Sequence, residues 1–153
     1  MTLQKKISNL SFLGFILIFF ACSNDKSDDI YAEARVDCVD RINEFRATED
    51  LPPLKRWSDK ESCADGEAKS DSISGIAHGA FGTCDEYAQN ECPGWGSVDD
   101  IISGCIQMMW DEGPGEPYSE HGHYINMSST SYTKVACGFY DTGSEVWSVM
   151  NFR

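Results

Sequence analysis

The chain has 153 residues, with 25 acidic side chains against 12 lysines and arginines, 41% hydrophobic residues and seven cysteines. This length suits one domain with a substantial core. The formal net charge of −13 argues against a nucleic-acid partner, because phosphate binding requires clustered Lys and Arg. Seven cysteines are too many for an ordinary reduced cytosolic protein of this size, and their odd number predicts that one differs in role from the others.

Residues 1–21 have the pattern of an export signal. Two lysines precede an apolar run at residues 10–20, and Cys22 follows it. The run is shorter than the roughly 20 residues that span a bilayer, so it is typical of a secretory signal. Cleavage just before a cysteine resembles a bacterial lipoprotein signal, in which Cys22 becomes the lipidated N-terminus. Ordinary secretion or a retained anchor is the alternative.

The segment after the signal is polar and acidic. Residues 22–33 therefore predict a flexible tether, and residues 34–153 the folded domain. A lipid on Cys22 would place this domain at the bacterial cell envelope, on the outer membrane or the cell surface. Without the lipid the domain would be secreted.

If Cys22 carries a lipid, six cysteines remain in the domain. An even set in an exported domain predicts three disulfides, although spacing alone leaves 15 connectivities open. No C-x-x-C pair occurs, which argues against a zinc ribbon or a thioredoxin-like redox site. The six are Cys38, Cys63, Cys84, Cys92, Cys105 and Cys137.

Helices are predicted in the first part of the domain. Apolar residues recur at helical spacing over residues 32–50, and two prolines then end that helix. A second helix is predicted over residues 58–74. Residues 75–97 read as a long Gly- and Cys-rich loop. A third helix is then predicted over residues 97–113, from a capping serine to a Gly-Pro-Gly stop.

Strands are predicted in the last part. Three short runs are rich in aromatic and β-branched residues, and a turn at residues 141–144 joins the last two as a hairpin. Helices followed by antiparallel strands predict an α+β domain. The three runs are His121–Met127, Thr133–Tyr140 and Glu145–Phe152.

The chain has only three histidines, His78, His121 and His123. On a strand, the two-residue period would place His121 and His123 on the same face. Two imidazoles on one face could bind zinc together with a third ligand. The alternative is that one ring is exposed and the other is hydrogen-bonded within the sheet.

Several short motifs occur in a fixed order along residues 34–153. They are Asn43–Ala47, Leu51–Trp57, Met109–Glu112, Gly122–Tyr124 with Lys134–Gly138, and Val146–Phe152. Together they resemble the CAP superfamily (SCP domain), which contains cysteine-rich secretory proteins, antigen 5 and pathogenesis-related proteins 1. The resemblance, here to a bacterial lipoprotein-like member, implies an α-β-α sandwich with a central antiparallel sheet between helical layers.

Family members place two His and two Glu in a central cleft. The resemblance implies that His78, His123 and Glu112 are three of these residues. His121 is expected at the rim of the cleft, or as an added ligand. Tyr124 is expected to line the cleft or to pack beneath it.

The fourth position of this set falls on Gln89, which replaces a glutamate. Glu86 or Glu91 could fill the role if the loop shifts its register. A glutamine cannot carry a proton back and forth, so any mechanism that needs both carboxylates is weakened. The predicted disulfides are Cys38–Cys63 between the first two helices, Cys84–Cys92 in the loop, and Cys105–Cys137 from the third helix to the sheet.

These features predict a monomeric binding module for a lipid, glycan or protein ligand, with a His-lined cleft. The alternative is a metal-assisted hydrolase of peptide or cell-wall substrates, with His78 and His123 holding Zn²⁺ and Glu112 as the catalytic general base. A purely structural role in the envelope is a third interpretation.

Overall fold

The computed structural model describes residues 29–153, so the predicted signal, Cys22 and most of the predicted tether lie outside the described residues. Helix α1 (Ala32–Ala47) already begins within the segment predicted as tether. Asp29 lies just before this helix and accepts hydrogen bonds from the guanidinium of Arg35, at 2.9 Å from its Nε. Within this part of the chain, no helix combines the length and the apolar character needed to cross a membrane.

The other helices follow the predicted order, with one addition near residue 120. A 3-10 turn (Ser58–Lys60) leads into α2 (Glu61–Ser74). The third helix has three segments: α3 (Val98–Asp100), the π-helical η2 (Ile101–Cys105) and α4 (Ile106–Asp111). Its predicted cap is confirmed, because the Ser97 side chain accepts the N–H of Asp100. The additional helix is α5 (Tyr118–Ser128).

Four strands form one sheet, in the order β1-β3-β4-β2. β3 (Lys134–Asp141) and β4 (Val146–Phe152) form the predicted antiparallel hairpin. β2 (Ala88–Trp95) pairs antiparallel with β4 at one edge, while β1 (Lys55–Arg56) pairs parallel with β3 at the other. The sheet is therefore mixed, not wholly antiparallel as predicted.

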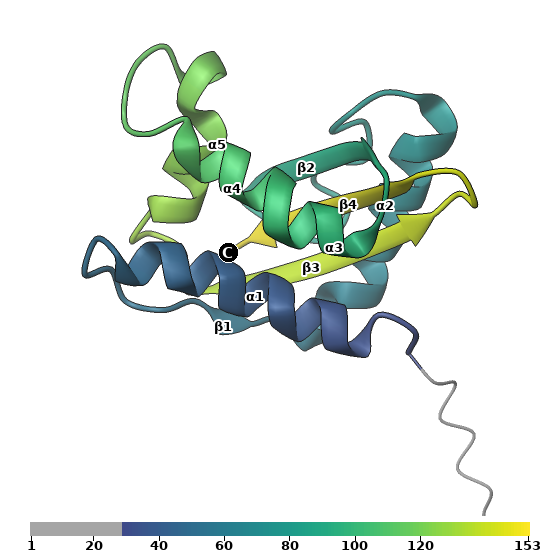
Figure 1. Cartoon of the computed structure of the whole chain (residues 1–153), viewed down its shortest axis with the longest axis horizontal. Coiled ribbons are helices and arrows are strands. Elements are labelled where there is room, and N and C mark those ends of the chain that lie inside the picture. The colour runs from purple at the N-terminus through teal and green to yellow at the C-terminus, as the bar shows by residue number, and fades with distance from the viewer. Residues whose placement is uncertain (1–28) are drawn as a thin grey trace, which may run out of the picture.

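Helices cover both faces of this sheet, so the α-β-α sandwich is confirmed (Figure 1). On one face α2 packs Ala64 and Ala68 against Trp147 and Val149. A close backbone approach at Gly138 makes this possible, since a Cβ there would lie 2.2 Å from the Ala64 carbonyl carbon. On the other face, a larger core joins α1, the third helix and α5 to the sheet.

Two elements differ from the prediction. Residues 88–95 form an edge strand rather than part of a loop, because pairing with β4 overrides a sequence that contains Pro93 and Gly94. The register shift between Cys92 and Trp95 accommodates these two residues. Residues 121–127 form a helix rather than a strand, since packing of α5 against the core outweighs local β propensity.

All three predicted disulfide pairings are wrong. Cys38 cannot reach Cys63, because α1 and α2 lie on opposite faces of the sheet, and it bonds to Cys137 on β3 instead. Cys84 and Cys92 are not bonded to each other: Cys84 bonds to Cys63, and Cys92 bonds to Cys105. The observed pairs are Cys38–Cys137, Cys63–Cys84 and Cys92–Cys105, with Cα–Cα distances of 6.5, 5.8 and 6.1 Å, which are normal for cystines.

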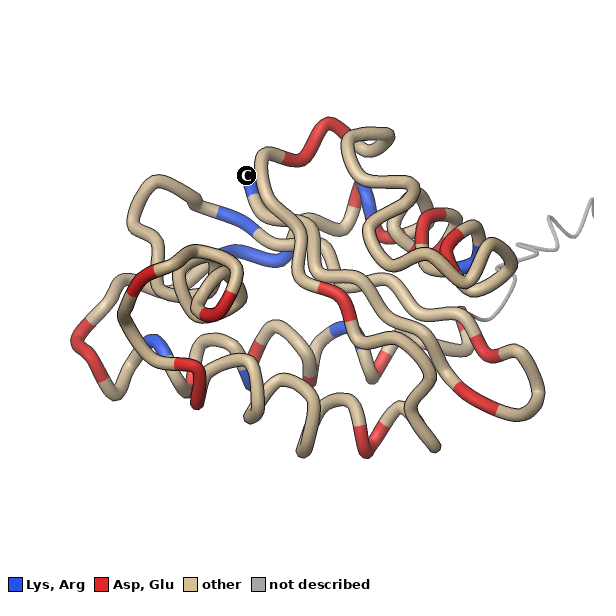
Figure 2. The backbone as a smooth tube through the Cα atoms, turned by 90° about the horizontal axis from the view of Figure 1, so that it is seen from above, with Lys and Arg blue, Asp and Glu red and all other residues tan. Residues whose placement is uncertain are grey.

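Acidic residues are distributed over much of the described backbone, although residues 121–140 contain none, and Lys and Arg are fewer (Figure 2).

Candidate functional site

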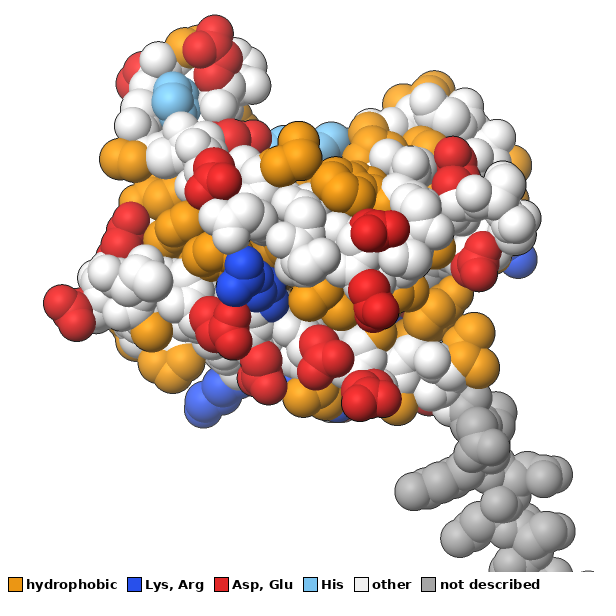
Figure 3. Space-filling view, in the orientation of Figure 1, with side chains coloured by type: hydrophobic (Ala, Val, Ile, Leu, Met, Phe, Trp, Pro, Cys, Tyr) orange, Lys and Arg blue, Asp and Glu red, His pale blue; other side chains and the backbone are white. Residues whose placement is uncertain are grey.

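The predicted cleft lies between three segments: the loop after α2, the edge strand β2 and helix α5. His78 from the loop, Gln89 from β2 and His123 from α5 line one cavity of about 230 Å³. In the space-filling view, histidine side chains lie in a hollow between two raised parts of the surface (Figure 3). The His78 and His123 ring centroids are 6.4 Å apart. A larger depression of about 520 Å³, between α1 and the third helix, contains none of the predicted site residues.

Glu112 fixes His123. The glutamate follows α4, and one carboxylate oxygen accepts the backbone N–H of His123 at 3.0 Å. The other oxygen lies 2.5 Å from Nδ1 of the same ring. Because an ionised carboxylate only accepts hydrogen bonds, the proton of a neutral imidazole is assigned to Nδ1. Nε2 of His123 is then the nitrogen left for another partner.

Gln89 fixes His78 in a similar way. Its side-chain NH₂ donates to Glu67 at 3.2 Å and to Asn151 at 3.0 Å, so its carbonyl oxygen faces His78. That oxygen lies 2.9 Å from Nδ1 of His78. Nδ1 is again the donor, and Nε2 is again the remaining nitrogen. The structure thus brings His78, Gln89, His123 and Glu112 together.

Glu91 holds the backbone beneath His78. Side chains two residues apart on a strand share a face, and both Gln89 and Glu91 on β2 contact His78. One Glu91 oxygen accepts the His78 backbone N–H, and it lies 3.7 Å from Nδ1. His78 has a φ of 59°, an uncommon conformation for a residue with a side chain, which this hydrogen bond helps to hold. Glu86 instead turns to the N–H groups of Gly82 and Cys84.

Several carboxyl groups are buried around this loop, and within residues 29–153 none of them pairs with a lysine or an arginine. Glu67 and Asp71 lie four residues apart on α2, so they share a face of the helix. Both are almost fully buried, as is Glu91. Among residues 29–153, no Lys or Arg forms an ion pair with any of the three. Neither Glu67 nor Asp71 was predicted as a site residue, although their four-residue spacing on a predicted helix is visible in the sequence.

The burial of these groups changes their protonation. Burial, reinforced by the nearby Asp71 carboxyl, raises the pKa of Glu91 to about 7. Burial also raises the pKa of Asp71 and of Glu67. The loop that carries His78 therefore rests on carboxyl groups that retain protons at unusually high pH.

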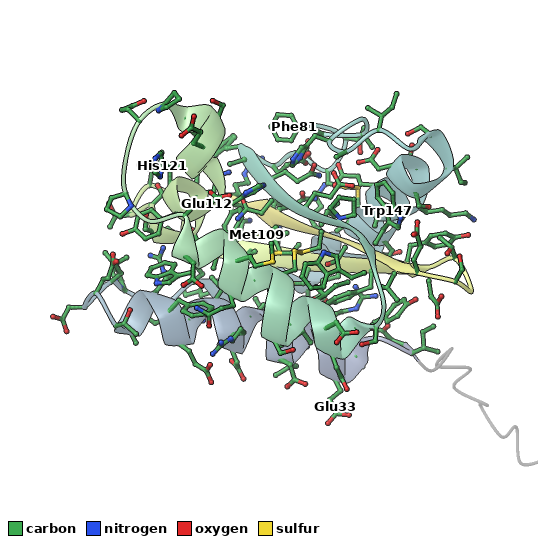
Figure 4. The ribbon with its side chains drawn as sticks, turned by 45° about the horizontal axis from the view of Figure 1, so that its top comes forward. Glu33, Phe81, Met109, Glu112, His121 and Trp147 are labelled. Carbon is green, nitrogen blue, oxygen red and sulfur yellow. A yellow bond between two sulfur atoms is a disulfide. The ribbon has the colours of Figure 1, made fainter. Side chains whose placement is uncertain are left out.

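His121 does not join the cleft. Its Nδ1 lies 2.8 Å from the Glu112 carbonyl oxygen and 3.0 Å from that of Gly113. Residues two apart on a helix point about 200° away from each other, so His121 and His123 diverge. The shared face predicted for a strand is wrong. Figure 4 shows His121 beside the loop that joins α4 and α5.

Tyr124 packs beneath the cleft rather than lining it. Its ring lies 4.8 Å from that of Trp110, and the residue is 7% exposed. Its hydroxyl donates to the Glu49 carboxylate, at 2.7 and 2.8 Å from the two oxygens. Burial and this contact raise the pKa of Tyr124. Its role here is to hold α5 against α1 and α4.

Neither cleft histidine belongs to a group of three metal-binding side chains among the described residues. Only one group of three metal-binding atoms comes within 4.8 Å among them, from Glu67, Cys84 and Glu86. Cys84 is bonded to Cys63, so it cannot supply a thiolate. His78 and His123 each keep one free nitrogen, but no third side-chain ligand joins them.

Comparison with known proteins agrees with this fold. The family model "CAP: Cysteine-rich secretory protein family" matches residues 39–152. No curated protein is significantly similar in sequence. The crystal structure of Na-ASP-1 is similar with a TM-score of 0.53 and 16% identity, over 78% of this chain and 38% of that one. Venom allergen-like protein 4 of Schistosoma mansoni is similar with a TM-score of 0.50 and 12% identity, over 79% of this chain and 88% of that one.

The solved structures and the family model support different conclusions. The two solved structures share only the fold with this chain, and the chain spans well under half of Na-ASP-1. The family model covers most of the described domain, including both cleft histidines and Glu112. The chain therefore belongs to the CAP family of cysteine-rich secretory proteins.

Proposed function

We propose that the chain is an exported binding module whose ligand occupies the cleft between His78 and His123. Membership of a family of secretory proteins and the three disulfides both fit an exported protein. The observation that carries the proposal is the amide of Gln89, which holds the His78 ring at 2.9 Å. An amide can orient an imidazole, but it cannot relay a proton. The arrangement therefore suits recognition better than proton transfer.

The cleft offers specific contacts to a ligand. The His78 and His123 side chains are 42% and 36% exposed, so both rings are accessible. Each ring is fixed at Nδ1 and keeps Nε2 for a hydrogen bond. Groups that are oriented before binding lose little conformational freedom when the ligand arrives, which favours affinity.

The geometry favours a hydrolase less. Both oxygens of Glu112 already accept hydrogen bonds from His123. A general base must instead reach the proton it removes. Together with Gln89, this leaves neither of the two glutamate positions that the family resemblance implies with a carboxylate free to act.

We further propose that Cys22 carries a lipid that anchors the domain to the bacterial envelope. The apolar run that ends just before Cys22 supports this assignment. Cells producing the wild type or a Cys22→Ala variant would be fractionated. The wild type is expected in the membrane fraction and the variant in the soluble one. Unchanged retention of the variant would contradict a lipid anchor.

One experiment tests the binding function. The chain, purified from a host that forms disulfides, would be titrated with neutral oligosaccharides, a fatty acid and a peptide pool while ¹⁵N–¹H NMR spectra are recorded. Saturable shifts confined to cleft residues, and lost in the His78→Ala/His123→Ala double variant, are expected for at least one class. Metal content and turnover of peptide and cell-wall substrates would be measured in parallel. If the chain binds metal stoichiometrically and turns over a substrate that the double variant does not, the protein is a hydrolase and the binding-module proposal is wrong.

A further inference from the structure

Exposed aromatic side chains gather beside the cleft. Among residues 29–153, the strongly exposed aromatic residues are Phe81, Tyr87 and Tyr118, at 48%, 64% and 56%. They come from three segments: the loop after α2, the residue before β2 and the start of α5. All three line one cavity of about 440 Å³, together with Tyr132. We call this cavity the aromatic groove.

The aromatic groove continues into the cleft. Its lining shares His78, Gln89, Tyr118 and Asn126 with the cavity that holds the two histidines. Figure 4 shows Phe81 at the upper edge of the molecule, on the loop that also carries His78. A ligand in the groove could therefore extend over the imidazoles.

The lining of both cavities carries no formal charge apart from any on the histidines. None of its residues is Asp, Glu, Lys or Arg, in a chain whose formal net charge is −13. A charged ligand would lose part of its hydration there, and no Asp, Glu, Lys or Arg of the lining would offset that cost. The groove therefore fits a ligand without net charge.

Two of the rings are held in place before any ligand arrives. The Arg153 guanidinium lies 4.6 Å from the centroid of the Tyr87 ring, within cation–π range. Tyr87 remains 64% exposed, so much of its ring is still accessible. The Tyr118 hydroxyl donates to Asn126 at 3.2 Å, which fixes the ring over the groove. Ordered aromatic rings are good platforms for stacking.

The polar groups of the groove decide between a hydrocarbon and a sugar. The hydroxyl of Tyr87 and Nε2 of His78 would be desolvated and unpaired beneath an acyl chain, which is unfavourable. A pyranose ring has apolar C–H faces and a rim of hydroxyls, so it can stack on the aromatic rings while its hydroxyls bond the polar groups. We propose that the aromatic groove and the adjoining cleft bind a neutral oligosaccharide. This rests on the proposed function and specifies its ligand class.

Calorimetric titration tests the proposal. The purified chain would be titrated with N-acetylchitohexaose, cellohexaose and maltohexaose, and separately with palmitate. At least one hexasaccharide is expected to bind saturably. Tyr87→Ala and Tyr118→Ala should each weaken binding by about 3- to 10-fold, because a stacking face is lost. Tyr118→Phe keeps the ring and should retain most of the affinity.

The control variant is Ile73→Ala. Ile73 is 74% exposed on α2 and lines neither cavity, so its loss should leave sugar binding unchanged. Equal thermal midpoints for all variants would show that weakened binding does not reflect unfolding. Sugar binding that the two tyrosine variants do not weaken would overturn the groove assignment. If palmitate or a peptide binds and no sugar does, the proposed ligand class is wrong but the proposed binding function stands. If no ligand of any class binds, both proposals are wrong.

Discussion

Arg46 on α1 donates two hydrogen bonds to the carbonyl oxygen of Pro52, from Nε at 2.9 Å and from Nη2 at 2.7 Å. Its Nη1 donates to the carbonyls of Met127 and Ser129, at 2.6 and 2.9 Å. The side chain is fully buried, and no carboxylate pairs with it among the described residues. Arg46 therefore joins the loop after α1 to the C-terminal end of α5. The same helix carries His123.

Arg46→Leu should lower the free energy of unfolding by about 3 kcal/mol or more, because buried carbonyl oxygens lose their donors. Urea unfolding followed by circular dichroism would measure it. Arg41→Ala is the control. Arg41 is half-exposed, pairs with the exposed Glu44, donates to Gln107 and lies over the Phe45 ring, so its loss should cost about 1 kcal/mol, well below the effect at Arg46. Equal effects of the two substitutions would contradict the role assigned to Arg46.

Gly138→Ala should destabilise the sandwich by more than about 2 kcal/mol, since its Cβ would lie 2.2 Å from the backbone of α2. Gly66→Ala is the control. Gly66 is on α2, the helix that Gly138 contacts, but a Cβ at Gly66 would meet nothing within 4 Å. That substitution should stabilise the protein by up to about 1 kcal/mol through helix propensity. Thermal unfolding of both variants compares them directly, and a tolerated Gly138→Ala would refute the tight helix–sheet contact.

Stability should fall as the pH rises from 5 to 8. The folded-state pKa of Glu91 is about 7, above its ordinary 4.5. Its contribution is therefore fully present below about pH 4.5 and is lost as the pH rises through 7. This change amounts to as much as about 3 kcal/mol, and the raised pKa values of Asp71 and Glu67 act in the same direction. Urea unfolding at several pH values would show it.

Glu91→Gln provides the control for this pH dependence. A glutamine keeps an oxygen that can accept the His78 N–H, but it does not titrate. The slope of stability between pH 5 and pH 8 should become shallower in this variant. Asp29 and Asp85 have lowered pKa values, so they affect stability only below about pH 4 and do not interfere. An unchanged slope would exclude Glu91 as its source.

Peptide mapping under non-reducing conditions should find Cys38 joined to Cys137, Cys63 to Cys84, and Cys92 to Cys105. Mass spectrometry before and after reduction would identify each linked pair. A linked Cys84–Cys92 peptide would contradict this pairing.

The sequence predicts local structure well where the signal is local. Periodicity and proline place α1, and the turn at residues 141–144 identifies the hairpin of β3 and β4. β2 depends on pairing with β4, a partner more than fifty residues away in the sequence, so its own residues do not reveal it. The same holds for the disulfides, whose partners depend on which face of the sheet each helix covers.

The site also combines residues that the sequence points to with residues that only the fold brings together. The family resemblance points to His78, His123, Glu112 and Gln89, and two of them, Glu112 and His123, stand in recognisable short motifs. The aromatic groove has no such pattern, since its rings come from segments that only the fold brings together. His121 was misplaced because its orientation depends on whether α5 is a helix or a strand.

The Cys38–Cys137 bond connects α1 to the centre of the sheet across 99 residues of sequence. Every loop of the cleft and of the aromatic groove from residue 75 to residue 132 lies between these two cysteines. A protease that cuts any one of these exposed loops therefore leaves two fragments joined by a covalent bond. Outside the cell, where proteases are common and chaperones scarce, a nicked molecule could keep its binding site assembled.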